Sequence, residues 1–165
     1  SGNGQRELME GLLGQRTPSR GKVRVKGQAY DATRREMQAH RVFSLPEMPL
    51  RNACVPGMSV ADNMALRNFD RSPLSHGPFL KRGALREQAR WLIENFKVKT
   101  PSPESPIQDL SGGNVQRAVL ARELSSDVDV LIAANPVFGL DFAAVSAIHG
   151  LPTLASVANP ASAAA

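Results

Sequence analysis

The sequence predicts an α/β domain, because segments typical of strands alternate with segments typical of helices along the chain. "KVRVK", residues 22–26, alternates with period two and ends at Gly27, as a half-exposed strand does. "RVFSL", residues 41–45, predicts a second strand that Pro46 ends. "DVLIAA", residues 129–134, is an unbroken apolar run, which is typical of a strand covered on both faces.

Helices are predicted between and after these strands. "QRELMEGLLG", residues 5–14, predicts a short helix that a glycine ends. Residues 48–99 are mainly helical, with Ser59 as a good N-cap. Their apolar stripe consists of Leu85, Ala89, Leu92 and Phe96. Residues 100–109, "TPSPESPIQD", predict a stiff, exposed connector, and residues 114–124 predict a further helix.

Composition favours a soluble cytoplasmic protein. The chain has 165 residues, of which 42% are hydrophobic, and this suffices for a packed core. No apolar run approaches the roughly 20 residues that a membrane helix needs. The single cysteine, Cys54, excludes an internal disulfide and fits a reducing compartment.

The net charge of +5 arises in the first part of the chain. Nine of the 20 basic residues, but only four of the 15 acidic residues, lie at or before Arg41. Such a segment could attract nucleic acid or an anionic membrane surface, or it could be a solvated sheet edge of alternating charge. The basic residues are dispersed, and few aromatic residues lie near them in the sequence, which favours the solvated sheet edge.

The first residues, "SGNGQREL", have the glycine spacing of a loop that cradles phosphates and lead directly into a helix. Gly2, Asn3 and Gly4 fit that form. A phosphate loop continues with a lysine and a serine or threonine, where this chain has Gln5 and Arg6. The amide of Gln5 is neutral, and the guanidinium of Arg6 has no lone pair for a metal ion. The glycine spacing of a phosphate-binding loop is therefore present, but the lysine that binds phosphate and the hydroxyl that binds the metal ion are absent.

The most specific stretch is residues 109–141, "DLSGGNVQRAVLARELSSDVDVLIAANPVFGLD". Ser111, Gly112 and Gly113 lead straight into a helix. Glycines let a backbone approach a ligand closely, and the free N–H groups of a helix N-terminus favour a phosphate. A buried strand and the turn "NPVFGLD" follow at a short interval.

This ensemble resembles the ATP-binding cassette (ABC) family, with its LSGG signature, signature helix, second nucleotide strand and GLD loop. "LSGGN" followed by Gln116 and Arg117 resembles the subfamily that powers bacterial sugar and nucleoside import, in which two cassettes are fused. Its second cassette is similar to "FSLPEMPLRNACVPGMSVADNMAL", where Glu47 replaces the usual glutamine of the lid-coupling loop. The resemblance covers residues 1–149 and implies a P-loop NTPase-like α/β fold with a helical subdomain and an incomplete central sheet.

The resemblance also implies that this cassette does not hydrolyse ATP by itself. The family ends its second nucleotide strand with an aspartate that helps to hold Mg²⁺ and a glutamate that orients water. Here those positions are Ala134 and Asn135. Alanine has no ligand atom, and an asparagine amide is no general base. With Gln5 and Arg6, these are four losses in one mechanism.

In the family, two cassettes face each other, and each signature covers the nucleotide held by the opposite phosphate loop. The resemblance thus implies that this chain completes an ATP and Mg²⁺ site on a partner cassette. The signature residues are Ser111, Gly112, Gly113, Asn114 and Gln116, and Asp141 would lie in the loop that communicates between the sites. Other implied partners are membrane permease subunits and, indirectly, a solute-binding protein. Nucleic acid is not expected, and the implied location is the inner face of the bacterial cell membrane.

The sequence predicts that the chain is a fragment of a cassette and that it consists of four segments. These are a partial nucleotide-binding core at 1–47, a helical subdomain and linker at 48–108, the signature helix and strand at 109–149, and a disordered tail at 150–165. Two alternatives stay open. A soluble, non-transport ABC protein would act on ribosomes or nucleic acid, and a plain interaction module would have lost its dependence on nucleotide.

The tryptophan, several methionines and the cysteine are expected to have structural roles rather than roles in a functional site. We expect Trp91 to pack within the helical subdomain. Met48, Met58 and Met64 are expected in the core, although methionines also suit an adaptable docking groove. Cys54 is expected to be inert, because no base or second thiol is near in the sequence.

Overall fold

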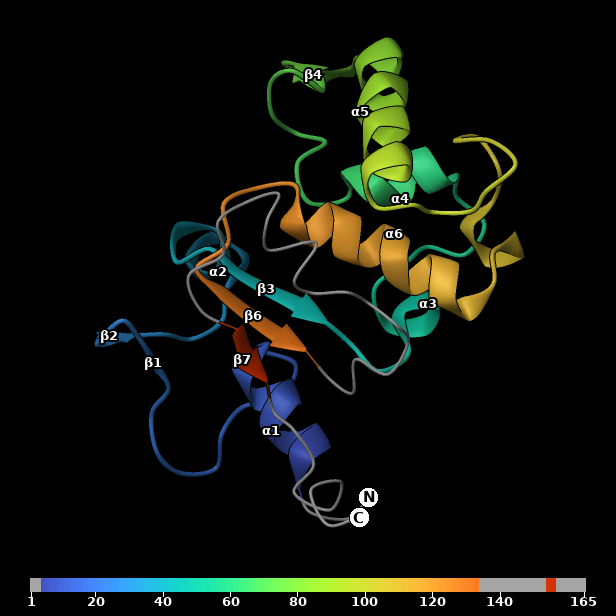
Figure 1. Ribbon diagram of the computed structural model, residues 1–165. Helices are drawn as coiled ribbons and strands as arrows, with labels where there is room; N and C mark the ends of the chain where they lie inside the picture. The colour runs from blue at the N-terminus through green and yellow to red at the C-terminus, as the bar shows by residue number, and fades with distance from the viewer. Residues whose placement is uncertain (1–3, 134–153, 157–165) are drawn as a thin grey trace.

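A three-stranded parallel sheet runs through the computed structural model, which describes residues 4–133 and 154–156 (Figure 1). Strands β3 (Val42–Leu45), β6 (Val130–Ala133) and β7 (Leu154–Ser156) form it in the order β3-β6-β7. The parallel pairing places Leu45 opposite Ala133. The predicted α/β class is confirmed, and both strands predicted at 41–45 and 129–134 form.

Each face of the sheet is covered. Phe43 of β3 and Leu131 of β6 point into a large core shared with the helices on one side. Val42 and Ile132, the alternate residues, point into a smaller core on the other side with Met9 of α1 (Gln5–Leu12). This burial on two faces accounts for the unbroken apolar run of the β6 sequence.

Helices α3 (Pro49–Asn52), α4 (Val60–Ala65), α5 (Arg82–Asn95) and α6 (Gly112–Leu124) form the helical layer (Figure 1). α6 packs on the sheet, and α5 lies beyond α4 and α6 (Figure 1). The predicted stripe of α5 is buried, from Leu85 to Phe96. Ser59 caps α4 as predicted, since its Oγ accepts a hydrogen bond from Asp62 N at 3.0 Å.

The remaining elements are short. They are β1 (Arg24–Val25), β2 (Gln28–Ala29), α2 (Arg34–Ala39), β4 (Ser75–His76), β5 (Phe79–Leu80) and the 3₁₀ helix η1 (Ile107–Asp109). The strand predicted at 22–26 is only two residues long, in an antiparallel hairpin with β2. α2 was not predicted, although Thr33 and Glu36 form a capping box that satisfies the backbone at its start.

Three sequence-based expectations about burial are wrong. Trp91 is 47% exposed on the surface of α5 rather than packed. Met48 and Met58 are exposed, at 50% and 37%, and only Met64 lies in the core. The connector at 100–109 is exposed at only part of its residues, and its backbone carbonyls at residues 103 and 105 accept hydrogen bonds from the first residues of α4.

Strand β7 also differs from expectation. Residues 150–165 were expected to form a disordered tail, but Leu154–Ser156 pair in parallel with β6. The pairing places Leu154 opposite Leu131 and Ser156 opposite Ala133. The other residues of that segment lie outside the described part of the chain.

A buried ion-pair network joins the helical layer to the sheet. Glu123 of α6 is 1% exposed, and its carboxylate accepts hydrogen bonds from Arg67 Nε at 2.9 Å and Arg122 Nε at 2.8 Å. Arg122 also donates to the carbonyl of Ala53 at 2.8 Å. The guanidinium of Arg67 lies over the ring of Phe43 in β3, with its carbon 4.8 Å from the ring centroid. Every charge in the network therefore has partners.

Candidate functional site

The predicted signature lies at the exposed N-terminus of α6. Ser111 is the N-cap in an extended conformation, and its carbonyl accepts the N–H groups of Asn114 at 2.8 Å and Val115 at 2.9 Å. The N–H groups of Gly112 and Gly113 donate to no described residue, as expected for the first turn of a helix. These groups and the helix dipole make this end of α6 suitable for an anion.

The two glycines are not required by the packing of the chain itself. A Cβ added at Gly112 or Gly113 would meet no described atom within 4 Å. The open space lies outside the protein, where a ligand or a partner could approach the backbone closely. The residues present therefore fit a phosphate group at this position.

Asn114 fixes the orientation of Ser111. Its Nδ2 donates to Ser111 Oγ at 2.9 Å, and its Oδ1 accepts from Lys99 N at 2.9 Å. Because Ser111 Oγ acts as the acceptor here, its own O–H remains able to donate to a phosphate oxygen. Arg117, one turn further on, donates to the carbonyl of Lys97 at 3.1 Å. The signature is thus attached to the chain that follows α5.

Gln116 does not share this exposure. It is 5% exposed and faces the protein interior. Its burial argues against the direct contact with a partner's nucleotide that the resemblance implies for it. Ser111 and Gly112 are exposed, and Gly113 and Asn114 are half-buried.

The start of the predicted phosphate loop is partly described. Gly4 is the N-cap of α1 with φ of +71°, a left-handed conformation that glycine adopts without strain. Gln5 and Arg6 are the first residues of α1. Gly2 and Asn3 lie outside the described residues.

The carboxyl edge of the sheet holds one further predicted site residue, Glu47. Because β3 and β6 are parallel and Leu45 pairs with Ala133, the chain leaves both strands at the same edge. Glu47 follows β3 there and is exposed. Ala134 and Asn135 follow β6, but they and Asp141 lie outside the described residues. In α/β sheets this edge is the usual ligand side.

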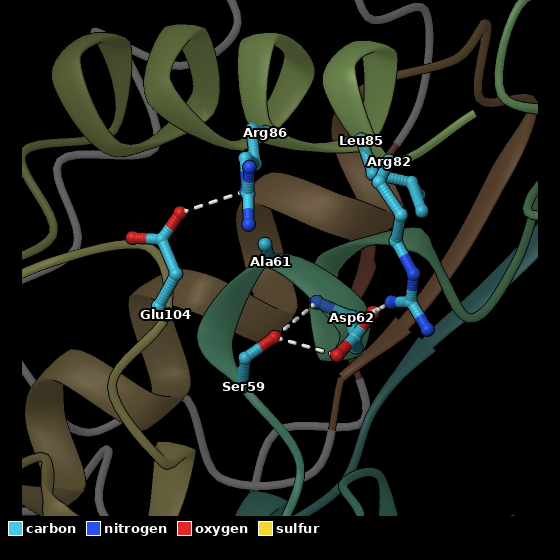
Figure 2. Close-up of a pocket in the computed structure, with 7 residues that line it drawn as sticks. All are labelled: Ser59, Ala61, Asp62, Arg82, Leu85, Arg86 and Glu104. Atoms are coloured by element: carbon cyan, nitrogen blue, oxygen red, sulfur yellow. Dashed lines mark hydrogen bonds and ion pairs between the residues drawn. The ribbon is translucent and has the colours of Figure 1, made fainter. Parts of the chain in front are cut away.

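A surface cleft of about 280 Å³ between α4 and α5 is not a comparable site (Figure 2). Its charged groups neutralise one another: Arg82 pairs with Asp62 at 2.7 Å, and Arg86 pairs with Glu104 at 3.1 Å (Figure 2). Cys54 is equally inert, since burial raises the pKa of its thiol and disfavours the thiolate.

Several basic residues of the N-terminal segment are engaged within the fold. The ion pairs are Arg16 with Glu10, Lys26 with Asp129 and Arg34 with Asp70. These contacts reduce the positive charge available to a polyanion. In the described part of the chain, no helix is both long and apolar enough to cross a membrane.

Comparison with known proteins identifies the family. The sequence profile described as "ABC transporter" matches residues 1–137. The chain belongs to the ABC transporter family. Among solved structures, this ABC chain resembles dimeric MJ0796, a bacterial ABC transporter cassette, with a TM-score of 0.63 and 18% identity over 87% of this chain and 61% of that one. It also resembles cbiO1 from Clostridium perfringens, with a TM-score of 0.55 and 21% identity over 90% of this chain and 57% of that one. These likenesses confirm the P-loop NTPase fold of ABC cassettes.

Curated relatives of this ABC chain are import proteins by name. The guanosine import ATP-binding protein NupO of Bacillus subtilis is 33% identical over 90% of this chain. The glucose import ATP-binding protein TsgD13 of Haloferax volcanii is 38% identical over 90%, and the ribose import ATP-binding protein RbsA 2 of Rubrobacter xylanophilus is 36% identical over 91%. The ABC chain spans less than a third of each relative, between 28% and 29% of their lengths.

Two features of the candidate site were missed from the sequence. One is the attachment of Asn114 to Lys99, because no local pattern predicts a contact between segments 15 residues apart. The other is the burial of Gln116. The apolar residues around it in α6 were a visible signal, since Val115, Ala118 and Val119 are all buried.

Proposed function

We propose that this chain is an ATP-binding cassette of an importer for sugars or nucleosides, and that its signature completes the ATP site of a partner cassette. The observation that carries the proposal is the open N-terminus of α6. Ser111 and the two glycines after it present a hydroxyl, free N–H groups and unfilled space at the surface. The names of the curated relatives support guanosine, glucose or ribose as the kind of cargo.

The chain's own nucleotide site is proposed to be inactive. Gln5 in place of a lysine replaces a charged donor to phosphate by a neutral amide, a loss on the order of 1 kcal/mol or more. Arg6 and Ala134 provide no Mg²⁺ ligand, and Asn135 provides no base. Mg²⁺ and ATP are therefore assigned to the partner site, where this chain would contribute Ser111, Gly112 and Gly113.

The proposed surroundings follow from this role. The segments 1–47, 48–108 and 109–149 would serve as nucleotide core, helical subdomain and signature region of a second cassette. Glu47, exposed at the carboxyl edge of the sheet, would lie in the lid-coupling loop, and Asp141 would lie in the loop between the two sites. The partners would be a competent cassette and permease subunits at the inner face of the membrane, with a solute-binding protein acting indirectly.

The test is ATP turnover by this chain alone and mixed with a competent N-terminal cassette of a sugar or nucleoside importer. We expect no turnover from the chain alone and an increase in the partner's rate on mixing. Ser111→Arg should abolish the increase, because the long side chain would fill the open space at the helix N-terminus. Ser19→Arg is the matched control, since Ser19 is also exposed but lies in the loop after α1.

Each other outcome rejects part of the proposal. Turnover by the isolated chain would show that the interpretation of Gln5, Arg6, Ala134 and Asn135 is wrong. An increase that Ser111→Arg leaves intact would favour the nucleotide-independent interaction module. A mixture without any increase would reject the completion of a partner site.

A further inference from the structure

The hairpin of β4 and β5 projects from the helical layer beside the start of α5 (Figure 1). His76 pairs with Phe79 in antiparallel register, and the two residues between them form the turn. Every residue from 76 to 83 is exposed. No described part of the chain therefore covers the outer part of this hairpin.

The base of the hairpin is fixed to the protein. Lys81 N donates to the carbonyl of Leu74 at 2.8 Å, which holds the two ends of the hairpin together. Leu74 is 1% exposed and packs with Ala65 of α4 and Leu85 of α5 in a small core. Two helices thus hold the hairpin in place while its outer residues stay in contact with solvent.

The exposed strand of the hairpin carries two apolar side chains. Phe79 is 74% exposed, the largest value among the exposed large hydrophobic residues of the described chain, and Leu80 is 42% exposed. Successive residues of a strand point to opposite faces, so each face of β5 presents one of them. A flat protein surface could cover only one face, whereas lipid surrounds an inserted segment on every side. The arrangement therefore fits a membrane interface better than a flat protein partner.

The charges of the hairpin suit an anionic surface. Residues 71–86 contain four basic residues and no acidic residue, so nothing in this segment repels an anion. Two of the four line the cleft between α4 and α5 and are paired with carboxylates there. Lys81, directly after Leu80, takes part in none of the ion pairs of the described residues. A lysine can extend its ammonium group to lipid headgroups while apolar neighbours contact acyl chains.

A nucleic acid fits this surface less well. Phe79 is the only aromatic residue of the hairpin, and Leu80 beside it has no ring on which a base could stack. A single unpaired lysine also neutralises few phosphates, whereas nucleic-acid binding depends on many such contacts.

We propose that the β4–β5 hairpin inserts Phe79 and Leu80 into the interface of an anionic lipid membrane, with Lys81 bound to the headgroups. One apolar tip with one cation binds a membrane weakly, so the hairpin would orient a protein that other contacts already hold there. The inference rests on the proposed location at a membrane but not on the signature or the ATP site. Vesicles without nucleotide or partner cassette test it separately from the ATP turnover experiment.

The test is co-sedimentation of the 165-residue chain with vesicles of phosphatidylcholine and phosphatidylglycerol in equal parts. We expect binding that Phe79→Ser weakens about tenfold, because apolar burial is lost. Lys81→Gln should weaken it about fivefold, and only when the vesicles contain the anionic lipid. Trp91→Ser is the matched control and should leave the affinity unchanged, since Trp91 is also an exposed aromatic residue, at 47%. It lies about 14 Å along α5 from the first residue of that helix.

Tryptophan fluorescence separates insertion from adsorption to the surface. Trp91 is the only tryptophan of the chain, so Phe79→Trp combined with Trp91→Phe places the only indole on the hairpin. Its emission should shift to shorter wavelength when the anionic vesicles are added, and the emission of the parent should not.

Four results would overturn the proposal. The parent chain fails to bind the anionic vesicles, or Trp91→Ser weakens binding as much as Phe79→Ser while far-UV circular dichroism shows both variants folded. The emission of the indole at position 79 stays unchanged on binding. Finally, the chain associates with itself without lipid and Phe79→Ser abolishes this association, which would assign the hairpin to a second copy of the chain.

Discussion

Replacing Glu123 by glutamine should destabilise the protein far more than a change at any exposed ion pair. The substitution preserves the size of the side chain but removes the charge that faces two guanidinium groups. Glu123 is 1% exposed, and the side chain of Arg122 is 7% exposed. Removing one partner of such a buried pair costs about 3–5 kcal/mol, because the other charge is left without compensation in a region that water does not reach.

The structure indicates the lower end of that range. Arg122 would keep its hydrogen bonds to the carbonyls of Ala53 at 2.8 Å and Asn63 at 3.2 Å. Arg67 is 22% exposed, so water would partly solvate its charge. We therefore expect a loss of about 3 kcal/mol. Native domains have only about 5–15 kcal/mol of stability in total, so this loss is a large fraction.

The assay is urea denaturation followed by circular dichroism. With a urea dependence of about 2 kcal/mol per molar, the midpoint of Glu123→Gln should fall by about 1.5 M. Arg86→Gln is the control, because the pair of Arg86 and Glu104 is about half exposed and should contribute about 0–1 kcal/mol. The reasoning is refuted if the two variants unfold within about 0.5 M of one another.

Two further changes should have measurable effects. Asn63→Ala should cost about 1–3 kcal/mol and speed hydrogen exchange at Val55 N–H, which Asn63 Oδ1 accepts at 2.8 Å; exchange that stays unchanged would contradict this. The hydrogen bond from Lys26 lowers the pKa of Asp129. Because the folded pKa is then below the unfolded value, the pair stabilises the protein above about pH 4, and its contribution is lost as the pH falls through the folded pKa. The melting temperatures of Asp129→Asn and the parent should differ at neutral pH and converge in acid, and a constant difference would count against the ion pair.

The elements that could be predicted from the sequence are those with a strong local period. α5 is amphipathic, so the spacing of Leu85, Ala89 and Leu92 marked its buried face. Trp91 was assigned to the interior by its apolar character alone, yet it is adjacent to Leu92 and points away from the buried stripe. α2 has six residues and no buried side chain, so its sequence lacks an apolar period, and only the capping box marked it.

The candidate site, like the fold, could be predicted from the sequence only in part. Ser111, Gly112 and Gly113 are consecutive, and the sequence alone predicted that they precede a helix. Gln116 was misplaced because α6 is surrounded by protein over most of its length, so a polar residue on it does not mark a surface.

The attachment of Asn114 to Lys99 determines how motion reaches the signature. The segment after α5 turns through Lys97, whose φ of +52° lets the chain reverse, and both Lys97 and Lys99 hold the first turns of α6. A protein that binds α5 and shifts its C-terminal end would therefore shift the hydroxyl of Ser111 in the same direction. A displacement of the outer helix would be transmitted to the N-terminal end of α6 through these hydrogen bonds, without passing through the sheet.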